Sequence, residues 1–239
     1  MRCILLLSIG LCTFFSSRAQ IKDGFKWLEN QEFEQAAQAF HQDLDKGKKA
    51  VVARYGLGLL YADEAYPRRQ ADSAYFYLSQ AYSDYRTAST GKKRKYQKWG
   101  LSPGKLTRIK GDIEKAAWEQ AEAAHTLEAY DFFLKKFEDA PRRLRRKAER
   151  AREQKSLELL LETKDLNIAQ QLFETLTSGR RRPNSPLFDQ GQRNLFQLYI
   201  AEKGWKAFPT FIEEYPDNPY VTDPARDEFL NIRTSGQAS

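Results

Sequence analysis

A short phrase that occurs twice constrains the fold of this chain more than any other feature of its sequence. Residues 129–141 read AYDFFLKKFEDAP, and residues 207–219 read AFPTFIEEYPDNP. The two copies match at aromatic, aspartate and proline positions: Phe133, Phe137, Asp139 and Pro141 in the first, and Phe211, Tyr215, Asp217 and Pro219 in the second. Each copy predicts a helix that buries one face and stops at a proline-bounded turn. An internal repeat of this kind indicates an array of similar units.

The N-terminal segment 1–19 has the features of a secretory signal peptide. A basic start precedes an apolar stretch, Ile4–Phe15, which is too short to cross a membrane, and a small-x-small site precedes Gln20. Read instead as a buried N-terminal helix, the segment would need a polar face, and none is visible. We therefore expect an exported protein whose mature chain begins at Gln20 and contains no transmembrane helix.

Both cysteines, Cys3 and Cys12, lie within this predicted signal peptide. The mature chain would therefore have no disulfide, no catalytic thiolate and no cysteine metal site. Cys12 also allows a lipoprotein interpretation, although Leu11 stands where a small residue is expected before a lipidated cysteine.

The rest of the chain shows apolar residues at helical spacing, and no strand pattern of any length. A triplet of residues at spacings of three and four recurs in it, and the middle residue is usually small. The five triplets are Phe33/Ala36/Phe40, Ala71/Ala74/Leu78, Leu127/Tyr130/Leu134, Leu166/Ala169/Phe173 and Trp205/Phe208/Ile212. We expect each triplet to lie on the second helix of a helical hairpin. Gly58 is expected to permit close helix packing.

These triplets resemble the second helix of a tetratricopeptide repeat, a family whose period is about 34 residues. The resemblance implies an all-α, TPR-like α-solenoid of helical hairpins. We expect TPR-like helix pairs over 20–86 and 105–232, with a basic loop or insertion at 87–104 between them and a flexible tail at 233–239. A last short helix is expected to start at Asp223-Pro224.

Two basic stretches have both a structural and a functional interpretation. Lys92–Lys95, with Tyr96 and Trp99 nearby, is read either as a solvated loop or extended helix turn, or as a protruding contact for a partner. Arg142, Arg146 and Arg150 recur at four-residue spacing, as a solvated helix face or as a patch for phosphate, lipid head groups or an acidic protein. The net charge of +7 makes contact with polyanions possible.

The sequence nominates no catalytic, cofactor-binding or metal-binding residue. His41 and His125 have no histidine or carboxylate at metal-ligand spacing, and neither a glycine-rich phosphate loop nor a G-x-S-x-G elbow occurs. We expect a protein that is not an enzyme and needs no cofactor.

The proline-ended phrase is similar to one found in tetratricopeptide proteins of the Gram-negative envelope. That resemblance implies a non-catalytic protein-protein interaction scaffold in the periplasm or at the outer membrane. The aromatic excess and the arginine face suggest the candidate partner-binding residues Tyr55, Tyr61, Tyr85, Trp99, Arg142, Arg146 and Arg150. The alternatives are a basic protein that binds an anionic lipid or polymer through Lys92–Lys95, Arg142–Arg152 and Arg180–Arg182, and a cell-wall hydrolase. Nucleic acid is an improbable partner for an exported chain.

Overall fold

The computed structural model describes residues 21–47, 49–178 and 185–221. The predicted signal peptide, the helix expected after Asp223, the tail 233–239 and Arg180–Arg182 lie outside the described residues.

The described chain is all-α and contains no strand, as the sequence predicts. Its α-helices are α1 (Ile21–Glu29), α2 (Phe33–Asp45), α3 (Ala50–Ala62), α4 (Ala71–Thr87), α5 (Thr90–Gln97), α6 (Pro103–Ala124), α7 (Leu127–Lys136), α8 (Arg142–Glu162), α9 (Leu166–Thr177), α10 (Pro186–Lys203) and α11 (Phe208–Glu214). Two short 3₁₀ helices are η1 (Trp205–Ala207) and η2 (Pro219–Val221).

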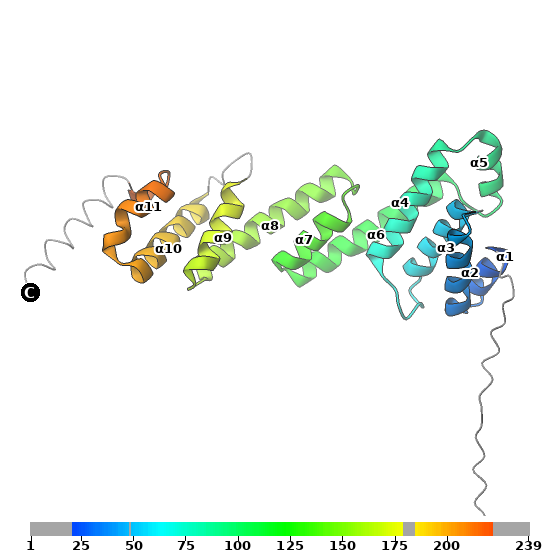
Figure 1. Ribbon diagram of the computed structural model, residues 1–239, viewed down its shortest axis with the longest axis horizontal. Coiled ribbons are helices and arrows are strands. Elements are labelled where there is room, and N and C mark those ends of the chain that lie inside the picture. The colour runs from blue at the N-terminus through cyan, green and yellow to red at the C-terminus, as the bar shows by residue number, and fades with distance from the viewer. Residues whose placement is uncertain (1–20, 48, 179–184, 222–239) are drawn as a thin grey trace, which may run out of the picture. The chain divides into compact units, whose positions relative to one another are not determined.

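The chain divides into two compact units between Ala117 and Trp118, inside α6. In the N-terminal unit, α1 packs on α2, α2 on α3, and α3 on α4 (Figure 1). In the C-terminal unit, α8 packs on α7, α9 and α10, and α10 also packs on α9 and α11. Helices thus pack mainly on their neighbours in sequence, which is consistent with an array of helical hairpins.

The middle residue of every predicted triplet is buried. The exposed fractions of Ala36, Ala74, Tyr130, Ala169 and Phe208 are between 0% and 3%. These residues lie on α2, α4, α7, α9 and α11, each of which follows a helix within its unit or at the unit boundary. The same position is therefore buried five times, whether its side chain is a methyl group or an aromatic ring.

The repeated phrase forms the same turn twice. Each helix ends at an aromatic residue with φ near −120° and ψ near 50°, Phe137 after α7 and Tyr215 after α11. The Phe137 amide donates to the Phe133 carbonyl, as the Tyr215 amide does to the Phe211 carbonyl, at 3.0 and 2.8 Å. A second bond closes each turn three residues later. The proline then marks the start of the next helical segment, as the N-cap residue of α8 (Pro141) and as the first residue of η2 (Pro219).

The aromatic side chain of Phe40 is enclosed in the N-terminal unit because two neighbouring residues lack side chains. A Cβ atom built on Gly24 or Gly56 would lie 2.7 or 2.4 Å from a Phe40 ring carbon. A Cβ atom built on Gly58 would lie 2.5 Å from the Cγ atom of Leu78. The expectation of close packing at Gly58 is therefore confirmed.

Local features also fix three helix boundaries. The Ser102 hydroxyl accepts a hydrogen bond from the Lys105 amide where α6 begins, and the Thr126 hydroxyl caps α7 by accepting from the Ala129 amide. Gly47 follows α2 with a φ of +67°, a conformation that favours glycine.

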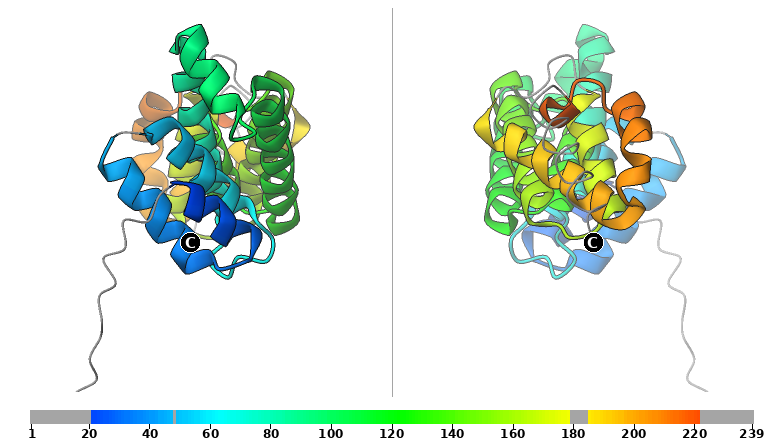
Figure 2. Two further views of the ribbon diagram at one scale, coloured as in Figure 1. Left: turned by 90° about the vertical axis from the view of Figure 1, so that its right-hand side faces the viewer. Right: turned by 90° about the vertical axis from the view of Figure 1, so that its left-hand side faces the viewer.

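The basic segment 87–104, expected as a loop or insertion, contains the eight-residue helix α5. Both Figure 1 and the left view of Figure 2 show α5 beyond the end of α4. The aromatic residues hold it in place: Trp99 stacks on Phe25 with ring centroids 5.5 Å apart, and Tyr96 lies 6.2 Å from Tyr85. Leu101, directly after these rings, is fully buried.

Candidate functional site

A cation-lined cavity of about 600 Å³ lies in the N-terminal unit. Its walls come from the start of α3, the end of α4, and α5 with the turn that follows it. This volume falls within the range of about 300–1,000 Å³ usual for ligand pockets. We call it the α3–α5 cavity; its lining residues are Gly47, Lys49, Ala50, Val51, Val52, Arg54, Asp84, Thr87, Ala88, Lys92, Lys95, Tyr96 and Trp99.

One ion pair crosses this cavity between its two helical walls. The Arg54 guanidinium of α3 donates to the Asp84 carboxylate of α4. Both side chains are partly exposed, so the pair contributes modestly to stability and mainly fixes the orientation of the guanidinium. Lys49, Lys92 and Lys95 remain, and within the described residues none of the three forms an ion pair. The cavity is therefore positively charged.

Helix α8 carries the second basic surface. Arg142, Arg146 and Arg150 are exposed, as expected from their spacing, and no side-chain partner occurs for them among the described residues. By contrast, Arg145 points back and donates to the carbonyls of Leu134 and Phe137, at 3.0 and 3.3 Å. That arginine satisfies the end of α7, so it is structural rather than available.

The tyrosines nominated from the sequence have mainly structural positions. Tyr55 is fully buried, and its hydroxyl donates to the Gly100 carbonyl at 3.4 Å. Tyr85 is 5% exposed. Their burial contradicts the idea that these two rings face a partner, and we omit them from the candidate surface. Tyr61 is partly buried and stacks on Tyr77, with ring centroids 5.8 Å apart. Of the four nominated aromatic residues, Trp99 alone lines the α3–α5 cavity.

The C-terminal unit has a groove of about 550 Å³ between α7, α8 and α9. The exposed side chain of Ile168 lies on it, together with Leu127, Leu159 and Leu172. Arg152 pairs with Asp131 within its lining, which also includes Glu128 and Glu162. This groove is apolar with an acidic margin, in contrast to the cavity of the N-terminal unit.

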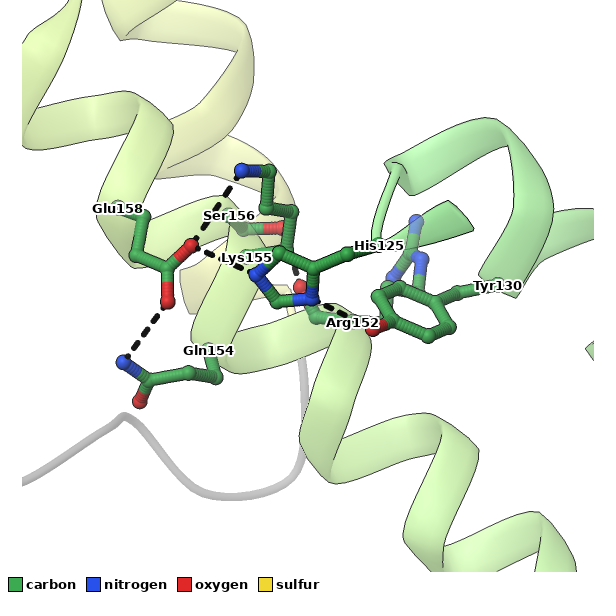
Figure 3. A network of polar contacts seen from close by, with 7 residues as sticks. All are labelled: His125, Tyr130, Arg152, Gln154, Lys155, Ser156 and Glu158. Atoms are coloured by element: carbon green, nitrogen blue, oxygen red, sulfur yellow. Dashed lines mark hydrogen bonds and ion pairs between the residues drawn. The ribbon is translucent and has the colours of Figure 1, made fainter. Parts of the chain in front are cut away.

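Figure 3 shows a polar network that joins the turn between α6 and α7 to α8. His125, at a φ of +48°, places its Nδ1 2.8 Å from the Tyr130 hydroxyl and its Nε2 3.1 Å from the Glu158 carboxylate. Burial, with the charges of Glu122 and Glu158, raises the pKa of Tyr130, so its phenol stays neutral and can donate to Nδ1. The nearby Ser156 hydroxyl donates to the Arg152 carbonyl of its own helix. The network thus fastens a strained turn to α8.

Glu158 is the acceptor at the centre of this network. Partial burial by itself would raise the pKa of its carboxyl, but hydrogen bonds from Gln154, His125 and Lys155 outweigh this effect. The pKa of folded Glu158 therefore lies below its ordinary value of 4.5. A lowered pKa means that the ionised carboxylate stabilises the fold above pH 4.5, and that this contribution is lost as the pH falls through the folded pKa.

We expect Glu158→Gln to destabilise the C-terminal unit by about 1 kcal/mol at neutral pH, because the charged acceptor is lost. The difference from the unsubstituted protein should begin to shrink below pH 4.5, where the carboxyl of the unfolded chain is protonated first, and should shrink further as the pH falls toward the lower pKa of folded Glu158. Urea unfolding of both proteins at pH 7 and at pH 3.5 measures this difference. Glu153→Gln, at an exposed position of the same helix, is the control. An equal difference at both pH values would contradict the role given to the ionised carboxylate.

Sequence reasoning missed Lys49, Arg54 and Asp84 as cavity residues, and His125 and Glu158 as partners. The basic run around Lys49 is visible in the sequence, but its approach to Lys92 and Lys95 depends on the packing of α5. Arg54 and Asp84 are 30 residues apart, and His125 and Glu158 are 33 apart. No local pattern relates residues at such separations.

No family model, curated protein or solved structure matches this chain. Within the described ranges, no cluster of three or more histidine, cysteine, aspartate or glutamate side chains could hold a metal ion. No helix within the same ranges is long and apolar enough to cross a membrane.

Proposed function

We propose that this protein is a non-catalytic scaffold of the bacterial cell envelope that binds segments of partner proteins. The observation that carries the proposal is the regular helix-pair packing, in which α2, α4, α7, α9 and α11 each bury the same triplet position. Helix-pair arrays of this kind present extended surfaces, and their usual role is to bind other chains. The envelope location rests on the predicted signal peptide and on the similarity to tetratricopeptide proteins.

Exposed apolar side chains on the second helices support a binding role. Phe76 on α4, Phe132 on α7 and Ile168 on α9 are 54%, 49% and 48% exposed. Single exposed apolar residues are common on proteins. Here, however, Phe76 and Phe132 both follow the buried middle residue of their triplet by two positions, and Ile168 borders a groove.

Photo-crosslinking at these positions tests the scaffold directly. A photoreactive phenylalanine replaces Phe76, Phe132 or Ile168 singly in the chain that begins at Gln20, which is then irradiated with an envelope fraction. We expect a crosslinked protein of one defined mass at one or more of these positions. The same substitution at Glu149, exposed on α8, should give none. The same adducts at Glu149 as at the three apolar positions, or no adduct at any of the three, would contradict binding by these surfaces.

A second candidate function, binding of a polyanion, is favoured by the unusual start of α8. The N-terminal end of a helix attracts negative charge, yet the first turn of α8 has no acidic residue and includes Arg142 and Arg143. Arg146 and Arg150 add like charges at four-residue spacing. This arrangement disfavours the helix locally, and a bound polyanion would compensate for it.

We expect the double substitution Arg142→Glu/Arg146→Glu to stabilise the fold but to weaken binding of a polyanion. Placing acid in the first turns of α8 should raise the free energy of unfolding by about 0.5–1 kcal/mol. Under the polyanion hypothesis, binding to vesicles that contain phosphatidylglycerol should fall about tenfold or more at low salt. Arg108→Glu with Lys164→Glu changes the net charge equally at two exposed positions elsewhere. Equal loss of vesicle binding in both variants would show that net charge, and not the α8 face, is responsible.

A further inference from the structure

We propose that the α3–α5 cavity binds an acidic segment of a partner protein. In this assignment, glutamate or aspartate side chains of the segment contact Lys49, Lys92 and Lys95, while an apolar side chain lies against Val51 and Trp99. The inference rests on the proposed scaffold function, and it adds the chemistry of the segment that one site selects.

The first step concerns which lysines of α5 are available. Lys93 is already engaged, because its ammonium donates to the Arg86 carbonyl at 3.1 Å and lies 5.7 Å from the centre of the Tyr85 ring. This contact, with the stacking of Trp99 on Phe25, fixes α5 against the rest of the unit. Lys92 and Lys95 of the same helix line the cavity. They are thus held in place by their helix without being neutralised.

The second step concerns charge complementarity. Lys49 comes from the turn before α3, so cations face the cavity from two separate elements. Asp84 is the single carboxylate in the lining, and it is paired with Arg54. A ligand that enters the cavity therefore meets lysine ammonium groups that are not paired with a carboxylate of the lining. Carboxylates in the ligand would form charge-assisted hydrogen bonds with them.

The third step concerns the apolar part of the lining. Ala50, Val51, Val52 and Ala88 contribute to it, together with the rings of Tyr96 and Trp99. One face of Trp99 is covered by Phe25, which leaves the indole as a rigid wall. Aromatic walls of this kind anchor apolar side chains of bound peptides.

These features favour a peptide over a phosphate group. Tight phosphate sites converge several donors on one point, often with the planar fork of an arginine. Here Arg54 is already paired through Nη1 with Asp84, and the lysines share the lining with apolar residues. A chain that carries carboxylates at intervals, with an apolar residue between them, satisfies both kinds of lining.

The test measures the affinity of the chain from Gln20 for a short fluorescent peptide in which glutamates alternate with leucines. The comparison peptide has glutamine at each glutamate position. We expect the acidic peptide to bind about tenfold or more tightly than its neutral counterpart. Pyrophosphate and phosphatidylglycerol vesicles serve as competitors. Neither should displace the peptide when the competitor concentration is low enough that its ions do not screen the charges of the peptide.

Charge reversal locates the site. Lys92→Glu with Lys95→Glu should weaken binding of the acidic peptide about tenfold or more. Arg108→Glu with Lys147→Glu, two exposed cations outside the cavity, is the matched control and should retain most of the affinity. The chain from Gln20 has no cysteine, so Lys95→Cys introduces a unique thiol. This thiol should react with a bromoacetyl group on the acidic peptide faster than the thiol of Lys147→Cys does.

Three outcomes would overturn the inference: equal binding of both peptides, equal loss in both charge-reversed pairs, or displacement of the peptide by pyrophosphate or by the vesicles. The last result would assign the cavity to phosphate groups. Failure of this inference differs from failure of the scaffold proposal. If the cavity has another role, the Lys92→Glu/Lys95→Glu protein still captures its envelope partner, whereas a failed scaffold captures none in either form.

Discussion

Replacement of Phe133 by alanine is expected to lower the free energy of unfolding of the C-terminal unit by about 3–5 kcal/mol. Phe133 is 1% exposed, and its ring lies 5.2 Å from Phe137 and 5.7 Å from Trp118. Its removal leaves a cavity at the turn that the chain forms twice. Urea unfolding followed by circular dichroism measures the loss.

The adjacent residue provides a matched control. Phe132 has the same side chain but is 49% exposed, and the Lys136 ammonium lies 5.9 Å from the centre of its ring. Phe132→Ala should therefore change the free energy of unfolding by less than about 1 kcal/mol. Equal losses for the two substitutions would contradict the buried register assigned to α7.

Substitution of Gly58 by alanine is expected to destabilise the N-terminal unit by about 1–3 kcal/mol. The new Cβ would lie 2.5 Å from a side-chain carbon of Leu78 and 3.3 Å from its backbone nitrogen. The side chain can rotate away, but the backbone of α4 can yield only if the two helices separate. A lower midpoint of urea unfolding is the expected result.

Gly111 provides a control of opposite sign. It lies within α6, and a Cβ built on it meets no atom within 4 Å. Gly111→Ala should stabilise the protein by about 0.5–1 kcal/mol, because alanine favours the helix and nothing obstructs it. Since both substitutions gain the same helix propensity, their difference isolates the packing of Gly58 on Leu78. Two stabilising substitutions would contradict that packing.

The helix-pair arrangement was predictable because its signal is local and repeated. Five triplets at helical spacing indicate which face of each second helix is buried, and Phe137 and Tyr215 mark where two of those helices end. The resemblance to tetratricopeptide repeats led to the correct fold class, all-α with sequential pairs. Membership of that family stays a prediction.

The candidate sites were less predictable because they depend on contacts between distant segments. The packing triplets do not include Tyr55 or Tyr85, so we predicted from the sequence that these two rings contact a partner. In the structure, the segment that contains α5 folds back: Tyr96 packs on Tyr85, Trp99 stacks on Phe25, and the Tyr55 hydroxyl donates to the Gly100 carbonyl at 3.4 Å. The same fold-back creates the α3–α5 cavity. The basic segment 87–104 thus contributes both to the burial of these tyrosines and to the walls of the main candidate site.

The central claim, that the protein is a scaffold for protein partners, is tested most directly by a crosslinking pull-down from envelope fractions across a salt series. The chain from Gln20 and its Arg142→Glu/Arg146→Glu variant serve as parallel baits. The scaffold proposal predicts that one discrete protein is retained at moderate salt by both baits. Capture of lipid or polymer alone, released as the salt concentration rises and absent from the variant, would contradict it and establish the arginine face of α8 as the functional surface.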